Sequence, residues 1–103
     1  MASLHAIGQL AEIPEGEGRN FEVAGRRVAV FRSRDGRVFA TQALCPHRKG
    51  PLSDGLLGGD TLVCPLHEWR FNLVTGATEN GTCALEVYEL RVEPDGTMVI
   101  TLP

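Results

Sequence analysis

The 103-residue sequence lacks several features that mark common classes of protein. It has no run of 18 apolar residues, which a membrane-spanning helix requires, and no charged start followed by an apolar stretch, which marks a secretory signal peptide. We therefore expect a cytoplasmic protein with no membrane partner. The formal net charge of −3 lacks the basic excess of nucleic-acid-binding domains, so we expect no nucleic-acid partner.

Signatures of catalysis are also missing. The sequence shows no nucleophile beside a base, no pair of carboxylates and no glycine-rich phosphate loop. We therefore predict no catalytic residues, and we do not expect the chain alone to turn over a substrate. No window has the period of a helix, which indicates an all-β fold.

Cysteine is scarce, but two of the three cysteines stand in short stretches that also contain histidine: Cys45-Pro46-His47 and Cys64-Pro65-Leu66-His67. Thiolates suit zinc, copper(I) and iron–sulfur centres, and imidazole suits zinc, copper and iron. Four such ligands leave two candidates, one tetrahedral zinc or a [2Fe–2S] cluster. Structural zinc sites usually pair Cys with Cys and His with His, whereas each stretch here is mixed. The predicted metal ligands are Cys45, His47, Cys64 and His67.

The segment from Cys45 to Phe71, CPHRKGPLSDGLLGGDTLVCPLHEWRF, resembles the Rieske iron–sulfur family, whose pattern is C-x-H and, after a loop, C-x-x-H. The resemblance extends along essentially the whole chain. It implies one Rieske-type [2Fe–2S] cluster, in which two His replace two Cys on one iron. It also implies that the two cysteines bind the inner iron and the two histidines the outer, solvent-facing iron.

The pattern is similar to that of the soluble branch of this family. Respiratory members are membrane-anchored and have an extra Cys in each ligand loop, and these two form a disulfide. Here the corresponding positions are Lys49 or its neighbours and Leu66. If two cysteines are ligands, Cys83 is left without an intramolecular partner, which fits a reducing compartment. We expect Cys83 to be a strand residue outside the site, and likewise His5.

The resemblance implies a Rieske-type fold of antiparallel sheets, and we expect residues 1–103 to form a single domain. A Gly/Pro-rich, cluster-binding inset is expected at about residues 43–76, with a loop at 11–18 and turns at 24–26, 34–37 and 93–96. Gly50 is expected to lie close to the cluster, and Gly58 and Gly59 to be simple turn residues. Strands are expected at residues 3–10, 28–31, 38–41, 61–63, 85–92 and 97–102.

Two positions bear on the redox potential. High-potential Rieske proteins place a Ser and a Tyr hydroxyl two and four residues after the second histidine, where this sequence has Trp69 and Phe71. Without these hydroxyls we expect a potential in the lower part of the family's span of roughly −150 to +300 mV. The expected docking rim around the histidines consists of Arg48, Lys49, Pro65, Leu66 and Glu68.

Three functions are compatible with the sequence. The first is the small subunit of an NAD(P)H-dependent assimilatory nitrite reductase, which the segment 83–92 resembles and whose partner would be the large subunit. The second is a ferredoxin that passes electrons from a flavoprotein reductase to an aromatic-ring dioxygenase or related oxygenase. Such ferredoxins commonly have proline after the Thr-Gly turn, and residues 77–87 have none, so we rank the nitrite reductase subunit first. The third is a zinc-binding interaction module, which we rank last.

Overall fold

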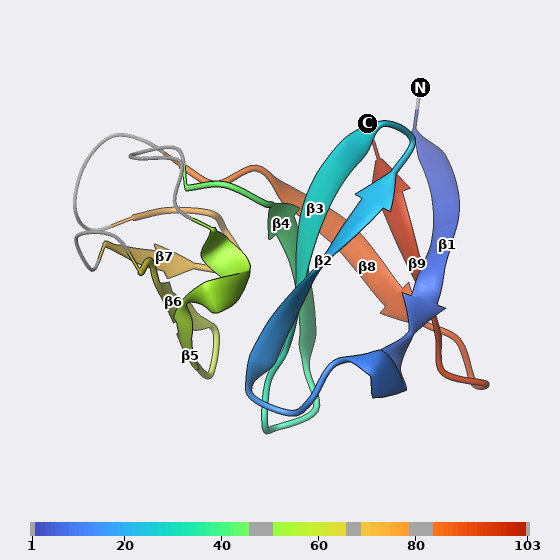
Figure 1. The fold of residues 1–103 in the computed structure, drawn as a ribbon, viewed down its shortest axis with the longest axis horizontal. Coiled ribbons are helices and arrows are strands. Elements are labelled where there is room, and N and C mark those ends of the chain that lie inside the picture. The colour runs from blue at the N-terminus through green and yellow to red at the C-terminus, as the bar shows by residue number, and fades with distance from the viewer. Residues whose placement is uncertain (1, 46–50, 66–68, 79–83, 103) are drawn as a thin grey trace.

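The computed structural model describes residues 2–45, 51–65, 69–78 and 84–102, which form two antiparallel sheets (Figure 1). The larger sheet has, in spatial order, β1 (Ser3–Gln9), β9 (Thr97–Leu102), β8 (Val87–Val92), β4 (Val38–Gln42), β3 (Arg26–Arg32) and β2 (Glu17–Val23). The smaller sheet consists of β5 (Leu56–Gly58), β6 (Thr61–Val63) and β7 (Arg70–Asn72). The helices among the described residues are two single 3₁₀ turns, η1 (Leu10–Glu12) and η2 (Leu52–Asp54). The expected all-β fold is confirmed.

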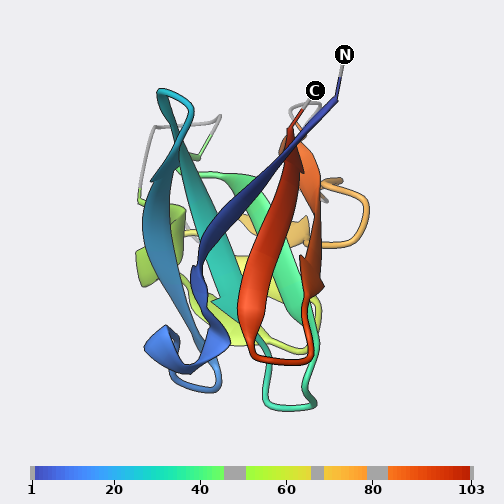
Figure 2. The ribbon, with the colours of Figure 1, turned by 90° about the vertical axis from the view of Figure 1, so that its right-hand side faces the viewer.

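The larger sheet curls around a first hydrophobic core. Figure 2 shows β1 crossing the open side of this sheet, between β9 and β2. Apolar side chains fill the space that the curled sheet encloses, and burying them is the main driving force for closing it. The buried members of this first core are Ile13, Val23, Val28, Val30, Ala40, Tyr88, Met98, Ile100 and Leu102.

Strand β3 is shared by both cores of the protein. Successive side chains of a strand point to opposite faces of its sheet. Val28 and Val30 belong to the first core, whereas Ala29 and Phe31 belong to a second core between the two sheets. All four side chains are fully buried, so the expectation of a central strand at 28–31 is confirmed. The second core also contains Cys45, Cys64 and residues of the smaller sheet. Strand β3 therefore supports both the cysteines and the smaller sheet.

Two glycines make the local geometry possible. The β2–β3 hairpin turns at Ala24 and Gly25, with φ of 50° and 80°, the positive values that a type I′ turn requires. The predicted hairpin is thus confirmed. In β2, a Cβ on Gly18 would lie 2.6 Å from the ring of Phe31 and 3.4 Å from the Cα of Ser53. Glycine at this position therefore lets η2 pack against the larger sheet.

The structure corrects several expectations about the elements, and the first strand, expected to reach residue 10, ends at Gln9. The loop expected at 11–18 holds part of η1, and β2 already begins at Glu17. Strands β5 and β7 were not expected, because three-residue strands are too short to show a period. The strand that we expected to begin at residue 85 begins at Val87. Before it, the backbone N–H of Leu85 donates to Gly76 O (2.8 Å) and not to a neighbouring strand of the larger sheet.

Candidate metal centre

Cys45 follows a short segment after β4, residues 43–44, which we call the stem of the first ligand loop. Backbone contacts pair this stem with residues 51–52. The N–H of Leu52 donates to the carbonyl oxygen of Ala43 (3.0 Å). Leu44 and Pro51 face each other as an isolated antiparallel bridge. These contacts fix where the chain leaves and where it returns, so Cys45 starts the first ligand loop from a defined position.

The second cysteine lies at the start of the connection between β6 and β7. The N–H of Cys64 donates to the carbonyl oxygen of Trp69 (2.7 Å), and Val63 and Arg70 pair in the sheet just before it. The connection is therefore a hairpin loop closed at its base. The two cysteines come from two such closed loops, which is the arrangement that the paired sequence stretches predict.

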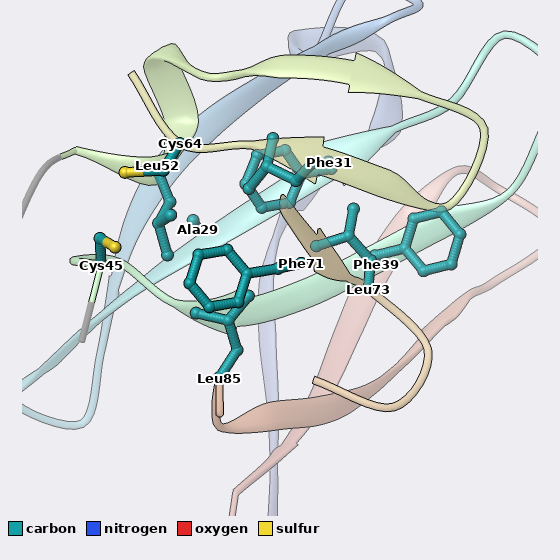
Figure 3. Packing of buried hydrophobic residues seen from close by; sticks show 10 residues of the cluster. Ala29, Phe31, Phe39, Cys45, Leu52, Cys64, Phe71, Leu73 and Leu85 are labelled. Atoms are coloured by element: carbon teal, nitrogen blue, oxygen red, sulfur yellow. The ribbon is translucent and has the colours of Figure 1, made fainter. Parts of the chain in front are cut away.

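The tertiary structure brings the two cysteines together in the second core. Cys45 and Cys64 are each 1% exposed, and neither is in a disulfide. Figure 3 shows both sulfurs at the same end of the cluster of buried side chains, with Phe39 at the opposite end. Two thiols that are distant in sequence thus share one buried site.

The surroundings of these thiols suit an iron–sulfur cluster. The other buried members of the second core carry no charge and no polar side-chain atom: Ala29, Phe31, Phe39, Leu52, Leu62, Phe71, Leu73 and Leu85. An ionised thiolate in apolar surroundings requires a positive charge beside it, which a metal ion supplies. Thiolate sulfur is also the ligand that iron–sulfur clusters use. The two cysteine donors and their environment therefore fit the predicted group.

An aromatic pair covers one flank of this site. Phe71 is 1% exposed, Trp69 is half-buried against the same core, and their ring centroids lie 6.4 Å apart with the planes tilted by 40°. Neither side chain has a hydroxyl that could donate to a cysteine sulfur. Both residues therefore pack over the core that contains the cysteines, and the low potential stays a prediction.

Several predicted positions lie outside the described residues. The candidate ligands His47 and His67 are among them. So are four residues of the expected rim, Arg48, Lys49, Leu66 and Glu68, and the two further residues Gly50 and Cys83. Of the rim, Pro65 is described and is exposed next to Cys64. The histidine ligands and the rim therefore remain predictions.

Sequence reasoning missed the part that Gly55 plays in the site. A Cβ at this position would lie 2.5 Å from the carbonyl oxygen of Val63 and 3.1 Å from that of Leu52. Only a glycine lets the end of η2 approach β6 this closely, directly before the strand delivers Cys64. The Asp54-Gly55 pair signals a turn in the sequence, but nothing in the sequence reveals this close approach.

The remaining histidine and the helices add no second site. His5 lies on β1, at the end of the larger sheet's strand order, with its Nε2 2.9 Å from Ser3 Oγ. The expectation that it is a strand residue is confirmed. In the part of the chain that the structure describes, no helix has the length and apolar character needed to cross a bilayer.

Comparison with known families gives one clear match. The sequence model of the Rieske [2Fe-2S] domain matches residues 3–91 of this chain. The ferredoxin component of the naphthalene 1,2-dioxygenase system of Pseudomonas aeruginosa is 35% identical over 95 residues, covering 87% of this chain and 88% of that protein. The chain also matches 22% of the length of a 3-ketosteroid-9-alpha-monooxygenase oxygenase component from Rhodococcus rhodochrous, with 33% identity.

Solved structures of two functional types resemble the fold. The ferredoxin of carbazole 1,9a-dioxygenase from Nocardioides aromaticivorans has a TM-score of 0.82 and 28% identity, with 98% of each chain covered. The nitrite reductase [NAD(P)H] small subunit from Erwinia carotovora has a TM-score of 0.81 and 25% identity, covering 97% of this chain and 82% of that one. These similarities are close in size, so they do not separate the two functional types.

Proposed function

The chain belongs to the Rieske [2Fe–2S] family, and from this membership we propose its ligands, its role and its partners. It is an electron-transfer protein with one Rieske-type [2Fe–2S] cluster, so the zinc-binding alternative is set aside. The side chains proposed to hold the cluster are Cys45, His47, Cys64 and His67.

One observation carries this assignment: two cysteines from separate closed loops, neither of them in a disulfide, lie buried at one end of a single apolar core (Figure 3). When bound, the cluster accepts and releases one electron. The protein's own part is to hold the ligands rigidly and to keep water away from the sulfurs. The backbone bonds at the bases of both loops hold the ligands, which limits rearrangement when the charge changes. The apolar core keeps water away from the sulfurs.

The shared strand β3 supports a single-domain organisation. We assign residues 1–103 to one domain, in which the inset at about 43–76 carries all four ligands. The contribution of β3 to both hydrophobic cores supports this, because neither core is complete without it. The proposed location is the cytoplasm, since neither buried cysteine is in a disulfide and a reducing compartment disfavours disulfides.

The first proposed partner is the large subunit of an NAD(P)H-dependent nitrite reductase. The segment after the second ligand loop, from Cys83 to Val92, supports it, as does the likeness to the small subunit from Erwinia carotovora. In this role the chain passes electrons within a stable complex.

The second proposed partner pair is a flavoprotein reductase and an oxygenase. The 35% identity to a dioxygenase ferredoxin, over nearly the whole length of both chains, specifically favours it. In this role the chain diffuses between two proteins, taking an electron from one and delivering it to the other.

The ligand assignment is tested by removing one thiol at a time. Cys45→Ser is expected to yield protein without the visible colour and without the anisotropic EPR signal of a reduced Rieske cluster. Cys83→Ser is the matched control, because Cys83 is the cysteine left outside the proposed ligand set, and this variant should keep full iron and sulfide content. Loss of the cluster in the control, with retention in Cys45→Ser, would refute the assignment.

The partner is tested by isolating the tagged protein from its native host under gentle, anaerobic conditions. Co-purification of a large protein with flavin and sirohaem, with NAD(P)H-dependent nitrite reduction in the eluate, would establish the subunit role. A lone coloured protein that a separate flavoprotein reductase can reduce, and that then drives an oxygenase, would establish the ferredoxin role.

A further inference from the structure

Strand β4 ends at Gln42, three residues before Cys45, where it still pairs with Val28 of β3. The last pair in the β4–β8 register is Thr41 with Val87. One more backbone bond follows, from the N–H of Gln42 to the carbonyl oxygen of Glu86 (3.0 Å). The carbonyl oxygen of Gln42 instead accepts a bond from the hydroxyl of Thr41 (2.8 Å), so the ordinary ladder ends here.

The side chain of Gln42 takes the place of its backbone carbonyl oxygen in the next bond to Glu86. Its Oε1 accepts a bond from the N–H of Glu86 (2.8 Å), and its Nε2 donates to the carbonyl oxygen of Leu44 (2.8 Å). The partners define the orientation of the amide, because an N–H can only donate and a carbonyl oxygen can only accept. The side-chain amide thus acts as a peptide group would, with one bond on each side.

These bonds belong to a chain of contacts from Leu44, before the first ligand loop, to Asn72, at the end of the strand that follows the second ligand loop. Leu44 directly precedes Cys45, so the amide holds the first stem against residues 84–86. On the far side, Leu85 is buried in the second core and its N–H donates to the carbonyl oxygen of Gly76 (2.8 Å). Gly76 in turn donates its N–H to the carbonyl oxygen of Asn72 at the end of β7 (2.7 Å), the strand that follows the second ligand loop.

We propose that Gln42 is a positioning residue for the cluster, which it serves by fixing the stem of the first ligand loop relative to the second. This inference rests on the proposed ligand role of Cys45. An amide is required, because an apolar side chain makes neither bond and a carboxylate cannot donate to the carbonyl oxygen of Leu44. Without the amide, the stem next to Cys45 has more freedom and the cluster is held less firmly.

The test compares three variants as cluster-loaded proteins. Gln42→Met removes both bonds at nearly constant length, and Gln42→Glu keeps only the acceptor. Gln9→Met is the matched control, because Gln9 also uses its amide Nε2 in a side-chain bond, to Thr97 Oγ1 (3.0 Å), but lies on β1. The measurements are the rate at which excess iron chelator bleaches the cluster, the EPR line shape of the reduced protein, and the temperature of unfolding.

Gln42→Met is expected to lose its cluster about fivefold faster than the wild type, the factor that corresponds to about 1 kcal/mol from the lost bonds. Its EPR lines should broaden, because the ligands adopt a wider range of geometries. Gln42→Glu should also bleach faster, whereas Gln9→Met should match the wild type in both cluster readouts. If Gln42→Met does not fold, the bleaching rate and line shape of Gln42→Glu test the proposal.

Two outcomes would overturn the inference: wild-type bleaching and line shape in the Gln42 variants, or an equal acceleration in Gln9→Met. Faster bleaching that merely follows a lowered unfolding temperature in all three variants would also overturn it, since it would mean a general loss of stability. A wild-type protein without a Rieske-type EPR signal would instead refute the proposed function, so the two failures are distinguishable.

Discussion

Phe71→Tyr is expected to raise the midpoint potential of the cluster. Phe71 is 1% exposed, and in Figure 3 its ring extends from β7 toward the end of the second core where Cys45 lies. A hydroxyl at the tip of this ring would be directed toward the cysteine sulfurs. A hydrogen bond to sulfur stabilises the reduced, more negative state, and this raises the potential.

The size of the increase follows from the free energy of one hydrogen bond. A bond that favours the reduced state by about 1 kcal/mol raises a one-electron potential by about 40 mV, because about 1.4 kcal/mol corresponds to 59 mV. A buried hydroxyl that finds no acceptor instead destabilises the fold by about 1–3 kcal/mol. The potential and the unfolding temperature together therefore tell whether the new hydroxyl has reached a sulfur.

The assay is a redox titration of the cluster-loaded variants, followed by circular dichroism or EPR. Phe39→Tyr is the matched control, because Phe39 belongs to the same core but lies at its opposite end from the cysteines (Figure 3). Its potential should equal that of the wild type. A folded, cluster-loaded Phe71→Tyr protein whose potential also equals that of the wild type would refute the reasoning.

Two further predictions concern stability. Gly55→Ala should destabilise the protein by about 1–3 kcal/mol in urea unfolding, because its Cβ would lie 2.5 Å from the carbonyl oxygen of Val63. Gly58→Ala, whose Cβ would meet nothing within 4 Å, should change little, and equal effects would contradict the close-approach argument. The Ser33 hydroxyl, which donates to the Asp35 carboxylate, lowers the pKa of that carboxyl below its ordinary value of 3.8. Because the folded-state pKa is depressed, the ionised group adds stability that is present above pH 3.8 and is lost as the pH falls through the folded-state pKa. Asp35→Asn should therefore flatten the acid side of a plot of unfolding free energy against pH, and an unchanged slope would count against the Ser33 contact.

Several features of this protein depend on local pattern and could be predicted from the sequence. The Cys/His stretches left zinc and an iron–sulfur cluster as candidates, the resemblance of residues 45–71 to the Rieske family favoured the cluster, and the family match supports that cofactor. The apolar run 28–31 predicted a central strand, and Ala24-Gly25 predicted a tight hairpin. These predictions succeed because ligand type, burial on both faces and positive φ each depend on a residue and its near neighbours.

The short strands β5 and β7 and the start of β8 were not predictable in the same way. A three-residue strand has too few side chains to show a period, and it exists only because neighbouring backbone groups are available. Leu85 has the sequence character of a strand residue, but its N–H bonds to Gly76. Boundaries of this kind are set by partners distant in sequence.

The contacts that hold the site together could be found only in the folded protein. Cys45 and Cys64 meet because β3 presents Ala29 and Phe31 to a core that both loops share. Gln42 resembles any polar strand residue until its amide is found between Leu44 and Glu86. Such hydrogen bonds and close approaches join residues that become neighbours only in the fold. The local sequence pattern therefore does not predict them.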